Sequence, residues 1–100
     1  MTSWSFLTTH ARVLLAIAED PEIRLRDIAA TVGVTERRAH AIVVDLTDSG
    51  YLTKHRIGRR NRYEIQSQRQ INDGVIKLTI GDVLDLLTQT SDATVHADRD

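Results

Sequence analysis

Hydrophobic residues recur three and four positions apart between residues 7 and 19, a spacing that predicts an amphipathic helix. The recurring residues are Leu7, Ala11, Leu14, Leu15 and Ala18. Thr8 or Thr9 can cap the N-terminus of this helix. Asp20 precedes Pro21, and a residue before proline is pushed out of helical conformation, so we expect the helix to end there. A second apolar line predicts that the helix is covered on two sides, and it consists of Val13 and Ile17.

Two more helices are predicted, separated by a three-residue turn. The first stops at Gly33 and has a short apolar face of Leu25, Ile28, Ala29 and Val32. Thr35 can cap the second, which extends over about residues 35–49, because its oxygen accepts from a free N–H group of the first turn. Gly50 is the expected left-handed residue past its end. The inward stripe of this helix is Ala39, Ile42, Val43 and Leu46.

After Gly50 the hydrophobic period changes from 3.6 to 2, which predicts a β-hairpin over about residues 51–66. Residues 51–57 and 62–66 are the expected strands, and the turn is Gly58-Arg59-Arg60-Asn61. Gly58 and Asn61 are expected at positive φ, as a tight hairpin requires. The residues expected to face the core are Leu52, Tyr63 and Ile65.

A last helix is predicted over about residues 79–90. Thr79 can cap it, with Asp82 at the third helical position. Its apolar stripe is Ile80, Val83, Leu84 and Leu87. From Thr90 onward the chain is polar and acidic, so we expect one domain over residues 1–90 and a disordered tail over residues 91–100.

Helix, short helix, three-residue turn, helix and hairpin is the order of a winged helix-turn-helix domain. The fold class is therefore mainly α with a small β-hairpin (α+β), with an extra C-terminal helix. Ala29 supports this assignment because a small residue lets the next helix cross closely. Gly33 provides the turn residue four positions later.

Composition narrows the class of protein. With 41% hydrophobic and 27% charged residues, the 100-residue chain is typical of one soluble globular domain. The lack of cysteine excludes disulfides and thiolate metal sites. No apolar run is long enough to cross a bilayer. The N-terminus begins Met1-Thr2-Ser3-Trp4 with no basic region leading into an apolar one, so we expect a cytoplasmic protein.

An enzyme is not expected. The sequence has no Gly-rich phosphate loop and no paired-carboxylate motif, and its histidines are dispersed at His10, His40, His55 and His96. A metal site made by His96 and Asp98 is a weak alternative, because residues in a tail are usually solvated. We therefore predict no catalytic residue, no cofactor and no metal.

Charge is distributed unevenly along the chain. Residues 1–72 carry 11 Lys/Arg against 8 Asp/Glu, and residues 73–100 carry 2 against 6. Most of the positive excess lies between Lys54 and Arg69, where six basic residues face Glu64 alone. Such a basic segment favours binding of a polyanion, and the alternative is a hairpin that is merely solvated.

The sequence also resembles small single-domain winged-helix regulators of the MarR/ArsR-like kind. The resemblance covers residues 4–66 and extends to residues 79–87, and it is carried by Phe6-Leu7-Thr8-Thr9-His10, Leu25-Arg26-Asp27-Ile28-Ala29, Gly50-Tyr51-Leu52-Thr53 and Gly58-Arg59-Arg60-Asn61-Arg62-Tyr63. It implies a DNA-binding transcriptional regulator that works as a homodimer.

In a winged-helix domain the third helix enters the major groove. Arg37 and Arg38 are the predicted base readers, since a guanidinium can donate twice to guanine. His40 flanks them, and Ala41 and Val44 can contact thymine methyl groups. The hydroxyl of Thr35 is expected to donate to a phosphate. The alternative is a solvated face on which Arg37 and Arg38 pair with Asp45 or Glu36.

The hairpin supplies the second predicted contact with DNA. Its basic side chains can lie along the backbone or reach the adjacent minor groove. Arg59 and Arg60 stand at the expected tip, and Lys54, Arg56 and Arg62 stand on the strands.

The apolar surface is larger than a minimal winged domain needs, which favours a two-fold homodimer. The predicted interface consists of Trp4, Phe6, Val13, Ile17, Ile80, Val83, Leu84 and Leu87. His10 is a weak candidate for adjusting this interface with pH. The alternative is that the last helix folds back and closes its own domain.

Two other classes of function remain open. A winged helix can bind a protein partner through the same surface, although such a wing does not need arginines at its tip. Binding of RNA is the less favoured hypothesis, because the sequence has no exposed aromatic residues on which single-stranded bases could stack. The sequence identifies no effector, and any signal would have to act at the dimer interface or through a partner protein.

Overall fold

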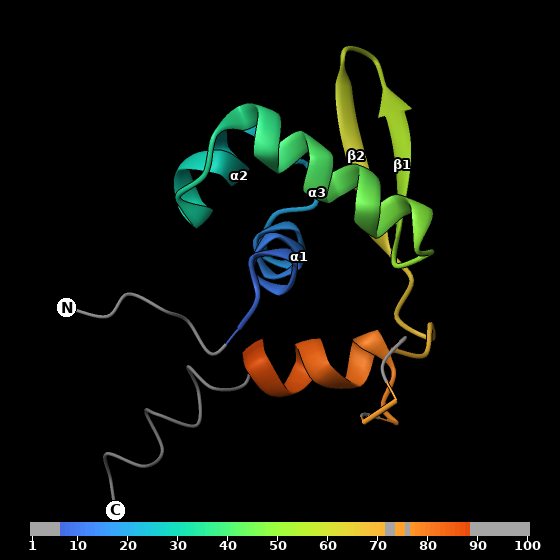
Figure 1. The fold of residues 1–100 in the computed structure, drawn as a ribbon. Helices are drawn as coiled ribbons and strands as arrows, with labels where there is room; N and C mark the ends of the chain where they lie inside the picture. Colours follow the sequence, from blue (N-terminus) through green and yellow to red (C-terminus); the bar gives the residue numbers. More distant parts are fainter. Residues whose placement is uncertain (1–6, 72–73, 76, 89–100) are drawn as a thin grey trace, which may run out of the picture.

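The computed structural model describes residues 7–71, 74–75 and 77–88. The order of elements is that of a winged helix-turn-helix, as predicted, and residues 80–88 add a C-terminal helix. Figure 1 shows α1 lying between α3 on one side and the C-terminal helix on the other. The elements are α1 (Thr9–Glu19), α2 (Leu25–Val32), α3 (Glu36–Asp48), β1 (Leu52–Ile57) and β2 (Arg60–Ile65).

The helix ends follow the local chemistry of the sequence. Thr8 caps α1, since its Oγ1 accepts from the backbone N–H of Ala11 at 3.1 Å. The chain leaves α1 at Asp20, directly before proline. Gly33 and Gly50 have φ values of 84° and 85°, which confirms the left-handed residue predicted at Gly50 and shows the same conformation at the predicted turn residue Gly33.

Apolar residues of the first three helices meet in one hydrophobic core. Ile17, Ile28 and Ile42, one from each of the first three helices, are fully buried. Ala29 and Ala39 are 4% and 0% exposed, and two such small side chains let α2 and α3 approach closely. Leu15 and Ala18 of the first apolar line on α1 are only partly buried, so the second line of that helix faces the centre.

The hairpin is tighter than the sequence pattern predicted. Ile57 pairs with Arg60, which leaves a loop of only Gly58 and Arg59. The four-residue turn was wrong, and so was positive φ at Asn61, which pairs with a residue of β1. A two-residue turn with glycine first needs positive φ at that glycine alone, and Gly58 has a φ of 61°. As predicted, Leu52 and Tyr63 are buried, while Ile65 is partly buried against the core.

Backbone bonds tie the start of the C-terminal helix to the segment that leaves β2. Ile80 N–H donates to the carbonyl of Arg69 at 2.8 Å, and Gly81 N–H donates to that of Ser67 at 2.9 Å. Thr79 caps the helix, since its Oγ1 accepts from Asp82 N–H at 3.1 Å. The C-terminal helix therefore folds back on its own domain.

The dimer interface predicted from sequence needs correction at four positions. Val13 and Ile17 are 0% exposed, and Ile80 and Leu84 are 6% and 8% exposed, all within the core of one chain. As predicted, α1 is packed on two sides. The C-terminal helix of the same chain, rather than a second copy, packs against one of these sides (Figure 1). Val83 and Leu87 keep partly exposed side chains.

Some predictions fall outside the described residues. These are the interface residues Trp4 and Phe6, the tail over residues 91–100, and the weak metal alternative at His96 and Asp98.

An apolar groove of about 470 Å³ opens between α1 and the C-terminal helix. Leu14 of α1, Leu46 of α3 and Leu84 of the C-terminal helix line it. His10 and Tyr51 bring polar groups to the same groove. All three helices therefore share one concave surface.

Candidate nucleic-acid interface

The residues of α3 divide cleanly between core and solvent. The exposed face comprises Arg37, Ala41, Val44 and Asp48, and Arg38 and His40 beside it are exposed too. Because successive residues of a helix are separated by about 100°, this face lies opposite the buried stripe. Every α3 side chain predicted to meet DNA is therefore accessible.

Thr35 stands at the N-terminus of α3, where the free N–H groups concentrate positive potential. Its Oγ1 accepts from the backbone N–H of Arg38 at 3.0 Å, so the predicted cap is confirmed. Because the hydroxyl accepts in this bond, its proton remains able to donate outward. The residue is exposed, which suits the predicted phosphate contact.

The arginines at the start of α3 are not neutralised by carboxylates within the described ranges. Neither Arg37 nor Arg38 lies within ion-pair distance of Asp45 or Glu36 there, so the alternative pairing is not formed. Asp45 instead bonds to His10 of α1. The guanidinium groups therefore keep their donors for an external acceptor.

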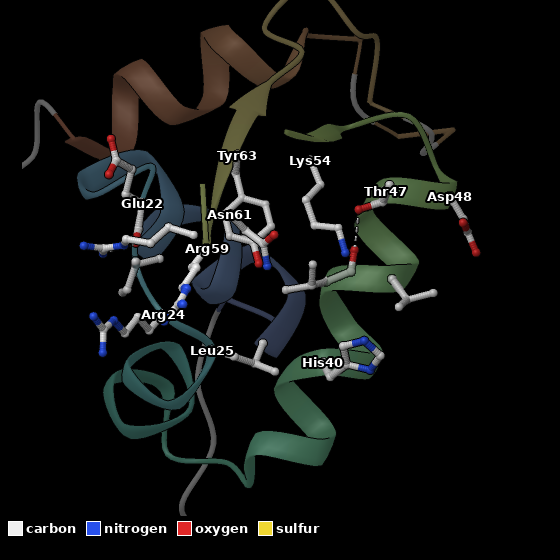
Figure 2. Close-up of a pocket in the computed structure, with 14 residues that line it drawn as sticks. Glu22, Arg24, Leu25, His40, Thr47, Asp48, Lys54, Arg59, Asn61 and Tyr63 are labelled. Carbon is white, nitrogen blue, oxygen red and sulfur yellow. Dashed lines mark hydrogen bonds between the residues drawn. The ribbon is translucent and has the colours of Figure 1, made fainter. Parts of the chain in front are cut away.

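A hollow of about 560 Å³ separates α3 from the hairpin. His40 lines it from α3, and Lys54 and Arg59 line it from the hairpin. In Figure 2, the Lys54 side chain extends from β1 towards α3. Four cationic residues line the hollow against two carboxylates: Arg24, Lys54, Arg59 and Arg60 against Glu22 and Asp48.

Residues of α3 and of the hairpin thus meet at this hollow. Arg37 lies three residues before His40 on the exposed face of α3, at the spacing that places helical side chains next to each other. His40 in turn lines the hollow with Lys54. The structure therefore brings His40 of α3 and part of the hairpin set to a common surface, next to the exposed face that carries Arg37.

Tyr63 lines the hollow and is 6% exposed. Burial raises the pKa of its phenol above the ordinary value of 10.0, and a side-chain hydrogen bond with Asn61 acts weakly in the other direction. The phenol therefore stays neutral at physiological pH.

Three of the predicted hairpin arginines are engaged within the protein. Arg56 Nε donates to the carbonyl of Gly58 at 3.2 Å. Arg60 Nη2 donates to the carbonyl of Glu22 at 2.9 Å, and Arg62 Nη1 lies 4.0 Å from Glu22 Oε2. Sequence analysis predicted the same DNA-contacting role for these side chains as for Lys54 and Arg59. In the structure, Arg56, Arg60 and Arg62 contact other residues of the protein.

Sequence reasoning missed two charged residues that line the hollow, Glu22 and Arg24. Both lie in the segment between α1 and α2, about 30 residues before the hairpin. No periodicity or motif marks them. Their position depends on the backbone bond from Tyr63 N–H to the carbonyl of Pro21, at 2.8 Å, which brings this segment beside β2.

No helix in the ranges 7–71 and 77–88 is both long and apolar enough to span a membrane. The described residues also contain no cluster of three His, Asp or Glu side chains that could hold a metal ion.

Residues 7–53 match a protein family described as winged helix-turn-helix DNA-binding. The match extends from the residue before the α1 cap to the second residue of β1, so it includes α3 and stops before most of the hairpin. A search of curated proteins found no match. The family match supports a winged helix-turn-helix DNA-binding domain and leaves the narrower resemblance to MarR/ArsR-like proteins as a prediction.

Proposed function

We propose that this protein is a MarR/ArsR-like transcriptional regulator that recognises a specific sequence in double-stranded DNA. It places α3 in the major groove and its hairpin on the adjacent backbone or minor groove. The observation that carries this proposal is the hollow between α3 and the hairpin, which His40, Lys54 and Arg59 line beside the exposed α3 face that holds Arg37. A polyanion is the ligand that best complements such a surface.

On α3, Arg37 and Arg38 read bases, and Ala41 and Val44 contact thymine methyl groups. Thr35 donates its hydroxyl proton to a phosphate at the helix entry. The far end of α3 carries Asp45 and Asp48, whose charges repel phosphate. The N-terminal turns of α3 therefore face the bases.

The regulator acts in the cytoplasm as a homodimer. Two-fold symmetry presents two α3 helices to half-sites one helical turn apart, so the operator is near-palindromic. With Val13 and Ile17 in the core, the apolar surface left for a second copy includes Val83, Leu87 and the 60%-exposed Leu86. Sedimentation equilibrium of the purified protein tests this state.

Selection of bound sequences from a random duplex pool tests the proposal. We expect enrichment of a near-palindromic motif. Arg37→Ala should relax the motif at the bases it reads, with a loss of about 1–3 kcal/mol in discrimination. Arg59→Ala should weaken all sequences alike, because a phosphate contact carries no sequence information.

Lys77→Ala is the matched control, because it removes one exposed positive charge from the segment before the C-terminal helix. It should bind DNA as the parent does. No enrichment from the pool would overturn the proposal and favour the second candidate, a winged helix that binds a protein partner. Equal affinity for single-stranded DNA or RNA would also contradict it.

A further inference from the structure

The loop between α1 and α2 is bonded to β2 through both backbone and side chains. Tyr63 N–H donates to the carbonyl of Pro21 at 2.8 Å. Next to this bond, Arg60 Nη2 donates to the carbonyl of Glu22 at 2.9 Å. Arg62 adds a longer contact of 4.0 Å to the Glu22 carboxylate, between two half-exposed side chains. The loop therefore supports the hairpin along its outer edge.

The loop is itself well fixed. The N–H of Glu22 donates to Asp20 Oδ1 at 3.1 Å, and the N–H of Ile23 donates to the carbonyl of Asp20 at 3.0 Å. Pro21 between them has a restricted φ. An aspartate that bonds the backbone two residues later forms a defined turn. The carbonyl that receives Arg60 is therefore held in place before any ligand arrives.

The hairpin needs such support. It consists of two strands with a two-residue loop, and a lone two-stranded hairpin is only marginally stable in water. Beyond Leu52 every residue of β1 is exposed. The core therefore holds the hairpin through Leu52, Tyr63 and the partly buried Ile65, all in the half away from the loop. The contact from Arg60 to Glu22 lies at the opposite end, since Arg60 is the first residue of β2.

We propose that Arg60 is a positioning residue that holds the hairpin against the Glu22 carbonyl, and that Lys54 and Arg59 make the DNA contacts of the wing. The inference rests on the proposed DNA-binding function. Its physical content is preorganisation: a wing fixed in the free protein loses less conformational entropy when DNA binds. Arg60 and Arg59 are adjacent, yet one has a carbonyl partner and the other has no partner within the described chain.

A guanidinium has five donors, so one bond to a carbonyl does not by itself prevent a phosphate contact. Amide hydrogen exchange in the free protein tests the anchoring without DNA. Arg60→Ala should raise exchange at the hairpin amides, Tyr63 included, by about tenfold, the factor expected for loss of one charge-assisted hydrogen bond. Arg59→Ala is the matched control and should leave these rates unchanged.

Binding to duplex DNA at several salt concentrations tests the positioning role. Arg59→Ala should reduce the slope of log K against log salt by about 0.9, the value for one phosphate contact. Arg60→Ala should weaken binding while leaving that slope close to the parent value. In the Arg59→Ala background, Arg60→Ala should cost less than it does alone, because it acts through its neighbour.

Additive losses, a full reduction in slope for Arg60→Ala and unchanged hydrogen exchange would together overturn the inference and make Arg60 an ordinary phosphate ligand. If no variant or parent binds DNA, the proposed function fails. The exchange experiment still decides whether Arg60 anchors the hairpin. Circular dichroism checks that each variant folds, as expected for substitutions of exposed residues.

Discussion

His10 Nε2 of α1 lies 2.8 Å from Asp45 Oδ2 of α3, so a side-chain bond connects the two helices across 35 positions of sequence. The bond occupies Asp45 on the flank of α3. Asp45 therefore does not neutralise Arg37 or Arg38, which lie earlier on the same helix.

A double-mutant cycle with His10→Ala and Asp45→Ala measures the strength of this bond. The two side chains are 37% and 58% exposed, and exposed pairs contribute little because water screens them. We expect a coupling free energy below about 1 kcal/mol in urea unfolding. A coupling well above that range would mean that the pair is a principal attachment of α3 to α1.

Lys54→Ala should weaken binding to every duplex and reduce the slope of log K against log salt by about 0.9. The reason is that the ammonium group on β1 borders the hollow beside α3, where a phosphate strand can approach. Fluorescence anisotropy at several salt concentrations gives the slope. Lys77→Ala removes the same charge elsewhere and should preserve it. Equal slopes for the two variants would exclude Lys54 from the interface.

Gly33→Ala and Gly50→Ala should both destabilise the protein, by about 1–2 kcal/mol each, because an L side chain is strained in the left-handed region. Space around the new Cβ differs. At Gly33 nothing lies within 4 Å, whereas at Gly50 the Arg69 guanidinium lies 3.2 Å away. Chemical denaturation should show a somewhat larger loss for Gly50→Ala. Combining Gly50→Ala with Arg69→Ala should remove this additional loss of stability. If the additional loss persists, its cause is the backbone conformation and not the contact with Arg69.

We expect Gly81→Ala to destabilise the protein, which is the opposite of what helix propensity alone predicts. Within a helix, alanine is ordinarily favoured over glycine by roughly 0.5–1 kcal/mol. Here a Cβ would lie 2.9 Å from the Ser67 carbonyl oxygen, so the C-terminal helix would have to shift. We expect a lower melting temperature. Gly74→Ala, which meets open space, should change it little. An unchanged or higher melting temperature for Gly81→Ala would show that this contact is not tight.

We expect the protein to lose stability at alkaline pH because the phenol of Tyr63 ionises there. Its pKa is raised in the folded protein by burial, so the folded state binds the proton more tightly than the unfolded state. The resulting stabilisation is fully present below pH 10 and is lost as pH rises through the folded-state pKa. Absorbance titration of the parent and of Tyr63→Phe isolates its curve by difference. A midpoint at or below 10 would contradict the assigned burial.

Features that depend on near neighbours in sequence could be predicted. The cap at Thr8, the turn at Gly33 and the outward face of α3 each follow from a few adjacent residues, and the structure has all three. The turn of the hairpin was misplaced because Gly58-Arg59-Arg60-Asn61 allows several turn lengths, and only the pairing register chooses among them.

Features that depend on distant contacts could not be predicted. The bond from Arg60 to Glu22 joins residues 38 positions apart, and composition marks Arg60 only as one more cation. Likewise, periodicity predicted that Val13 and Ile17 are buried. It did not show whether they are buried within their own chain or against a second copy. Both outcomes were decided by how the helices and the hairpin meet in space.

The apolar groove beside α1 connects α3 directly to the C-terminal helix. Leu46 belongs to the helix that carries the proposed base readers, and Leu84 belongs to the helix on the other side of α1, yet both line this groove. Any molecule bound between them would contact α3 directly. The groove and the proposed base reader Arg37 lie on opposite faces of this one helix, so a change in the position of α3 would reach both.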